Sequence, residues 1–101
     1  MNFADTLKTL PECAGDKLVL TDAAGVAVAA IANAPGSAGS FRVYAYLAGK
    51  HGGISPAAAT EGLVIFAEHT DDARLHPGKH PNIDRLFGVQ ANGSTLQALI
   101  E

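Results

Sequence analysis

Apolar residues recur with a helical period in two short parts of the chain. Near the start, an apolar stripe ends at Pro11, which stops a helix, and this predicts a short docking helix containing Phe3, Leu7 and Leu10. Residues 33–39 (NAPGSAG) have the composition of an ordinary turn and lack the Gly-Lys-Ser/Thr ending of a phosphate-binding loop. Ser40 can then cap a second helix over residues 41–50, with an apolar stripe formed by Phe41, Tyr44 and Leu47.

A third and longer helix is predicted over residues 56–76. Ser55 suits the N-cap, Pro56 suits the first helical position, and Pro77 disfavours helical geometry in the residue before it. At about 100° per residue, one face is expected to pack inward: Ala59, Leu63, Phe66, Ala67, Thr70 and Ala73. The opposite, outward face mixes ionisable groups with one isoleucine: Glu61, Ile65, Glu68, His69, Asp72 and His76. Gly62 indicates a close approach by another backbone.

Four other runs have the composition of β-strands. Residues 17–21 (KLVLT) and 26–32 (VAVAAIA) flank a turn that opens with Asp22 and closes with Gly25, which predicts a hairpin. Because the second run is apolar at nearly every position, we expect an inner strand or one covered on both faces. Residues 86–90 and 95–100 flank Asn92-Gly93-Ser94 and predict a second hairpin, which leaves at most one helical turn after Pro81.

The order of these elements predicts an α+β fold. Two hairpins would form a four-stranded, mostly antiparallel sheet, with a helical hairpin and the short N-terminal helix packed on one face. The 101 residues suit a single domain spanning residues 1–101.

Composition narrows the classes of partner. The formal net charge of -3 offers no basic surface for a phosphate backbone, so we expect no nucleic-acid partner. With 48% hydrophobic and 17% charged residues, the chain is richer in apolar side chains than an average domain surface requires. Some apolar surface is therefore expected to bind a protein partner or a second copy of the chain.

The single cysteine, Cys13, excludes an internal disulfide and a multi-thiolate zinc site. Glu12 beside it would discourage the thiolate, so Cys13 is a poor candidate for a nucleophile. The chain has no apolar run of signal-peptide or membrane-spanning length, and we expect a cytoplasmic protein without a membrane partner.

Most of the chemically versatile side chains lie between residues 69 and 85. His69, Asp72 and His76 follow an i, i+3, i+7 pattern, and His80 and Arg85 complete the candidate polar site. Imidazole and carboxylate suit zinc and other divalent metals, so His69, Asp72 and His76 form an alternative metal site. His69 and His76 would, however, be ~10.5 Å apart along a helix, and no His-Glu-x-x-His motif is present. The simpler interpretation is a solvated helix end in which Asp72 pairs with a neighbouring cation, and no cofactor is expected.

Apolar and ionisable groups share the outward face of the same predicted helix. Val64 and Leu75 flank it and Ile65 lies within it, so a candidate interaction face consists of Val64, Ile65, Glu68 and Leu75. The sequence therefore favours a protein-interaction or regulatory module, with self-association as one form. A divalent-metal-binding or hydrolytic protein that uses His69, Asp72, His76 and His80 is the alternative, and the sequence leaves open whether the protein is an enzyme.

The run EHTDDARLHPGKHPNIDRLF (residues 68–87), preceded by an apolar helix and an N-terminal hairpin, resembles a small bacterial family known as domain of unknown function 2322. The spacing of histidine and proline in this run carries the resemblance. The resemblance implies a compact bacterial domain, and it assigns no activity and no catalytic residue.

Overall fold

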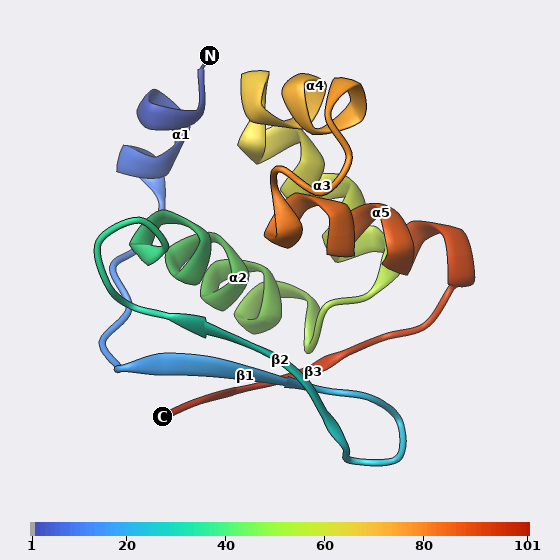
Figure 1. Ribbon diagram of the computed structural model, residues 1–101. Helices are drawn as coiled ribbons and strands as arrows, with labels where there is room; N and C mark the ends of the chain where they lie inside the picture. Colours follow the sequence, from blue (N-terminus) through green and yellow to red (C-terminus); the bar gives the residue numbers. More distant parts are fainter. Residues whose placement is uncertain (1) are drawn as a thin grey trace.

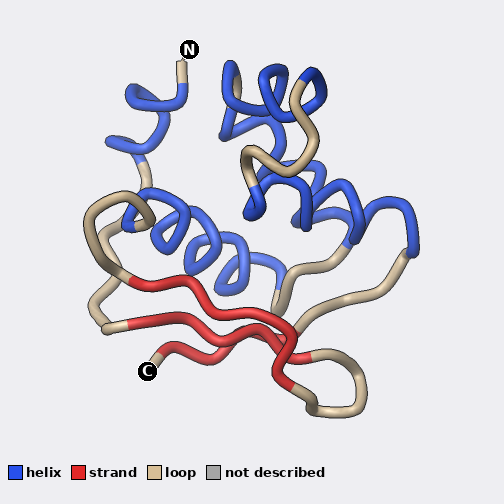
Figure 2. The backbone as a smooth tube through the Cα atoms, in the orientation of Figure 1, coloured by secondary structure: helices blue, strands red, loops and turns tan. Residues whose placement is uncertain are grey.

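The computed structural model describes residues 2–101 and forms two layers, a β-sheet and a set of helices (Figure 1). The helices are α1 (Phe3–Thr9), α2 (Ala38–His51), α3 (Pro56–Phe66), α4 (Glu68–Leu75) and α5 (Pro81–Asn92). The strands are β1 (Lys17–Thr21), β2 (Ala27–Ala32) and β3 (Gln97–Ile100). All five helices lie on one side of the sheet, and α2 packs directly on it (Figure 2). The α+β class is confirmed.

The first predicted hairpin is present. β1 and β2 pair antiparallel, with Leu18 opposite Ile31 and Leu20 opposite Ala29. The Asp22 carboxylate closes the turn, since Oδ1 accepts hydrogen bonds from the amides of Ala24 and Val26 at 2.9 and 3.0 Å. Gly25 takes a φ of 80°, which a residue with a Cβ rarely adopts. The local sequence therefore suffices to form this turn.

The sheet has three strands in the order β2-β1-β3, and the prediction of four strands is wrong. Residues 86–90 belong to α5, which runs from Pro81 to Asn92 and ends at Gly93 in the left-handed conformation, with a φ of 72°. Pro81 opens the helix, and Ile83, Leu86 and Val89 are buried at a spacing of three residues. Asn92-Gly93 suits a helix end as well as a hairpin turn, and here the helix is favoured because these three side chains reach the core.

β2 lies at an edge of the sheet, so the expectation of an inner strand is also wrong. The central strand is β1, which pairs with β2 on one side and with β3 on the other. Most of β2 is exposed, and only Ile31 is buried. An apolar strand is therefore left with one unpaired edge.

The predicted long helix is two helices, because the backbone breaks at Ala67, where φ is 50° and ψ is −115°. The buried Thr70 hydroxyl donates a 2.6 Å hydrogen bond to the carbonyl of Leu63, one of the last carbonyls of α3. The break turns α4 relative to α3, so their side chains no longer share one outward face. Ile65 is buried, with 6% of its surface exposed, and its place on the outward face was predicted wrongly.

The core lies between α2, α3, α5 and the sheet. Its largest fully buried side chains come from α2, the sheet, α5 and the segment just before α3: Tyr44, Phe41, Leu18, Leu20, Ile31, Leu47, Ile54, Leu86 and Val43. Side chains from α2 and α5 lie close to Gly62 on α3, since a Cβ there would lie 2.8 Å from Leu86 and 2.9 Å from Leu47. A close approach at Gly62 is present, but the prediction that another backbone makes it is wrong.

Candidate functional site

The structure brings Asp72, Lys79 and His80 together at the junction of α4 and α5. His80 precedes α5 as its N-cap residue, and its Nε2 lies 2.6 Å from Oδ2 of Asp72. Lys79 Nζ lies 2.9 Å from the same oxygen. The hydrogen bond with His80, followed by that with Lys79, lowers the pKa of Asp72 to about 2. Asp72 is therefore a carboxylate at neutral pH, and His80 is oriented with Nε2–H toward it.

The other predicted members of the polar site join this cluster only in part. His76 is mostly exposed, and its Nε2 lies 3.8 Å from Oδ1 of Asp72. The His69 ring packs edge-on against Phe3 and lies 5.8 Å from the His80 ring, between centroids. Lys79, which was not among the predicted site residues, makes the close contact with Asp72 that was predicted for His76.

Arg85 belongs to a separate cluster beneath the start of α5. Its Nη1 donates to the Tyr44 hydroxyl at 3.2 Å and to Oδ1 of Asn82 at 2.8 Å. The Tyr44 hydroxyl in turn donates to the carbonyl of Asn82. Burial raises the pKa of Tyr44 to about 12, although Arg85 opposes this shift. Tyr44 is thus a buried hydrogen-bond donor that fixes the first turn of α5.

The metal alternative gains no support from the geometry. Within residues 2–101, no three His, Cys, Asp or Glu side chains are grouped to hold a metal ion. Asp72 is shared by two nearby nitrogen donors, those of His80 and Lys79, and Lys79 would have to leave before a cation could bind there.

The predicted interaction face is divided between two helices. Val64 on α3 and Leu75 on α4 are 74% and 76% exposed. Glu68 is exposed, and its Oε1 accepts a 2.7 Å hydrogen bond from the amide of Phe3, which lowers the pKa of Glu68. Ile65 faces the core instead. Val64 borders an open hollow of about 690 Å³ between α3, α4 and α5, whereas Leu75 does not line it.

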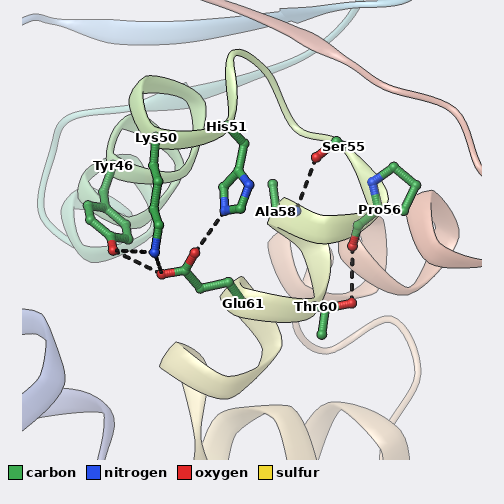
Figure 3. A network of polar contacts seen from close by, with 8 residues as sticks. All are labelled: Tyr46, Lys50, His51, Ser55, Pro56, Ala58, Thr60 and Glu61. Carbon is green, nitrogen blue, oxygen red and sulfur yellow. Dashed lines mark hydrogen bonds and ion pairs between the residues drawn. The ribbon is translucent and has the colours of Figure 1, made fainter.

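A third polar cluster, centred on Glu61, joins α2 to α3 (Figure 3). Glu61 Oε2 accepts hydrogen bonds from the Tyr46 hydroxyl at 2.9 Å and from Lys50 Nζ at 3.1 Å. Its Oε1 lies 2.8 Å from Nε2 of His51. Partial burial acts to raise the pKa of Glu61, but the bonds with His51, Lys50 and Tyr46 together lower it. One signal for this cluster is present in the sequence, since Lys50 and His51 end α2 and Glu61 lies in the first half of α3.

No helix or strand of the described residues covers the face of the sheet that points away from the helices (Figure 1). Val19 lies at its centre and is paired with Ala30 of β2 and Leu99 of β3. Leu99 is 60% exposed. We call Val19, Ala30 and Leu99 the open sheet face. Val28 lies at a shift of register between β1 and β2 and is 51% exposed.

These features define a small α+β domain with a three-stranded antiparallel sheet, an apolar face and three polar clusters on its helical layer. The chain belongs to a bacterial protein family described as "uncharacterized protein conserved in bacteria" (DUF2322), whose profile matches residues 3–100. The resemblance inferred from residues 68–87 is therefore confirmed. No curated protein and no solved structure shows significant similarity to the chain. In the part of the chain that the structure describes, no helix has the length and apolar character needed to span a membrane.

Proposed function

We propose that this protein is a protein-interaction module that pairs with a second copy of itself along the outer edge of β2. The observation that carries the proposal is the composition of that edge. Residues 27–32 (AVAAIA) contain no charged residue and no proline. Protein sheets ordinarily protect an exposed edge with such residues, because unpaired backbone N–H and C=O groups can template another strand.

The surroundings of β2 support the same partner. Val26 and Val28 are 57% and 51% exposed and lie on the hairpin that extends beyond the helical layer (Figure 1). Antiparallel pairing of two β2 strands about a two-fold axis would join two three-stranded sheets. It would also bring the two open sheet faces side by side as one continuous apolar surface. The alanines of β2 are small enough to allow this approach.

A second copy is favoured over an unrelated partner because the edge is self-complementary. It offers only backbone hydrogen bonds and small apolar side chains, and a two-fold pairing matches each group with its equivalent. The edge formed by β3 is less suitable. Leu96, just before β3, already exchanges two backbone hydrogen bonds with Ile54, and a Lys17–Glu101 ion pair lies at its other end.

The proposal is tested by placing a charge on the β2 edge. Ala30 is exposed, so Ala30→Lys should leave the monomer folded and prevent pairing of two edges. Ala91→Lys makes the same exchange on the exposed end of α5 and serves as the matched control. Light scattering should give twice the monomer mass of 10.3 kDa for the wild type and the control, and the monomer mass for Ala30→Lys. A monomeric wild type, or a dimer that persists in Ala30→Lys, would refute this interface.

A further inference from the structure

We infer that a pocket on the helical layer, lined by His69, Lys79 and His80, binds a small organic anion. The pocket has a volume of about 280 Å³ and lies where the starts of α2 and α5 meet α1 and α4. This volume is at the lower end of the ~300–1,000 Å³ typical of ligand pockets, so it suits a small molecule. The site is independent of the β2 edge, because β2 contributes no residue to its lining.

The donors of the lining favour an anion over a cation. Lys79 and two imidazoles line the pocket, and no aspartate or glutamate of residues 2–101 does. Of the neighbouring carboxylates, Glu68 accepts the amide of Phe3, and Asp84 accepts the amide of Gly78 at 2.9 Å. Asp72 pairs with Lys79 and His80 and balances the charge of Lys79, so an anion in the pocket would share these two donors with Asp72.

Among residues 2–101, the hydrogen bonds around the pocket leave donors available to a ligand. Arg85 donates to Oδ1 of Asn82, so the two N–H donors of that amide remain for an incoming acceptor. Ser40, at the start of α2, adds a hydroxyl to the lining. The beginning of α5 also lies at the pocket, and the partial positive charge of a helix N-terminus adds to the attraction for an anion.

The remaining walls are apolar and indicate the body of the ligand. Phe3 and Phe66 stack with their ring centroids 5.2 Å apart, and Ile83 completes this wall. An apolar body that carries one anionic group therefore fits better than a bare inorganic ion. The shared chemistry is a carboxylate or phosphate on a ring or short hydrocarbon.

The test compares four probes with the full chain by NMR titration. Benzoate and phenyl phosphate combine a ring with an anionic group, benzamide has the ring without the charge, and acetate has the charge without the ring. We expect at least one of the two aromatic anions to bind about tenfold more tightly than benzamide and acetate, with shifts at Phe3, His69 and Asn82. Preference for phenyl phosphate over benzoate would identify the group as a phosphate, and the reverse as a carboxylate. Equal binding of benzamide, or no binding of either aromatic anion, would overturn the inference.

Substitutions assign the binding to this pocket. Lys79→Ala removes a charge that is 59% exposed, so the fold is expected to survive, and binding should weaken about tenfold. His69→Ala should also weaken it. His76→Ala removes a histidine that pairs with Asp72 but does not line the pocket, and it should bind as the wild type does. Unchanged affinity in Lys79→Ala would place the ligand elsewhere and contradict the proposal, whether or not His69→Ala folds.

Discussion

At the scale of single residues, the strained backbone of Ala67 decides which way the side chains of α3 and α4 face. Ala67 is the one residue other than glycine with a positive φ among residues 2–101, and its φ of 50° and ψ of −115° are costly for a side chain with a Cβ. The break that it makes separates Ile65, which enters the core, from Asp72, which enters the polar cluster. A straight helix would have placed both residues on the same side.

Ala67→Gly is expected to stabilise the protein. Glycine in a helix interior ordinarily costs about 1 kcal/mol relative to alanine, but at this φ the relief of ~1–3 kcal/mol of strain should exceed the entropic cost. We expect a gain of about 1 kcal/mol in the free energy of unfolding by urea. Ala57→Gly, within regular helix on α3, is the control and should lose stability. A loss of similar size at both positions would mean that Ala67 is not strained.

Asp72 should make the free energy of unfolding depend on pH. Because its pKa falls from 3.8 to about 2 on folding, the charged carboxylate favours the folded state above about pH 4. This contribution is lost as the pH falls from about 4 to about 2. Asp72→Asn should therefore be less stable than the wild type at pH 7, and the difference should disappear near pH 2.

The measurement is a series of urea melts from pH 7 to pH 2, with Asp71→Asn as control. Asp71 is 79% exposed and pairs only with Arg74 within the described chain, so its substitution should have little effect at any pH. A difference between Asp72→Asn and the wild type that stays constant down to pH 2 would contradict the role given to the His80 and Lys79 contacts.

At the scale of elements, local signals predicted the starts of α3 and of the first hairpin. The Ser40 cap was predicted wrongly, since α2 begins at Ala38 with Ser37 as its N-cap residue, and contacts distant in sequence decided the start of α4 and the extent of α5. Ser55 and Pro56 begin α3 as expected, with Ser55 Oγ accepting the Ala58 amide at 3.1 Å. The end of α4 at His76 was also predicted. No proline or glycine marks the break at Ala67. The hydrogen bond from Thr70 to Leu63 that accompanies the break spans seven residues. Sequence periodicity alone could not show it.

The prediction of a hairpin over residues 86–100 was wrong for a different reason. The residues of this region suit two structures, since Leu86, Phe87 and Val89 have strand propensity while Ile83, Leu86 and Val89 form a helical stripe. Packing against α3 favours the helix. Part of the polar site was predicted, since His80 contacts Asp72. The contact depends on how α4 and α5 pack against one another. The same packing places Lys79 beside Asp72 and leaves His76 exposed.

The Glu61 cluster is expected to hold α2 against α3. Glu61→Gln keeps the shape of the side chain but removes its charge and leaves Lys50, Tyr46 and His51 with a weaker acceptor (Figure 3). We expect a loss of about 1 kcal/mol in urea melts at pH 7, given that the group is partly exposed. Glu12→Gln, at an exposed position outside any helix or strand, should change little. Equal effects at both sites would show that the cluster contributes nothing specific to the fold.

At the scale of the whole molecule, the helices leave one face and one edge of the sheet uncovered. The fourth strand predicted from the sequence would have paired with residues 95–100 and covered the edge formed by β3. β2 is an uncharged strand at the other margin of the sheet. The surplus of apolar residues that the sequence indicated lies largely on β2, its hairpin and Leu99, rather than on one helix face.

The most direct test of β2 self-pairing is an isotope-filtered NOE experiment on an equal mixture of labelled and unlabelled protein. Only contacts between two copies are detected in such a sample. Pairing along β2 predicts inter-chain NOEs among residues 28–32, including contacts between Ala30 and its neighbours on the other copy. Inter-chain NOEs confined to the helical layer, for example at Val64 and Leu75, or none at millimolar concentration, would contradict it.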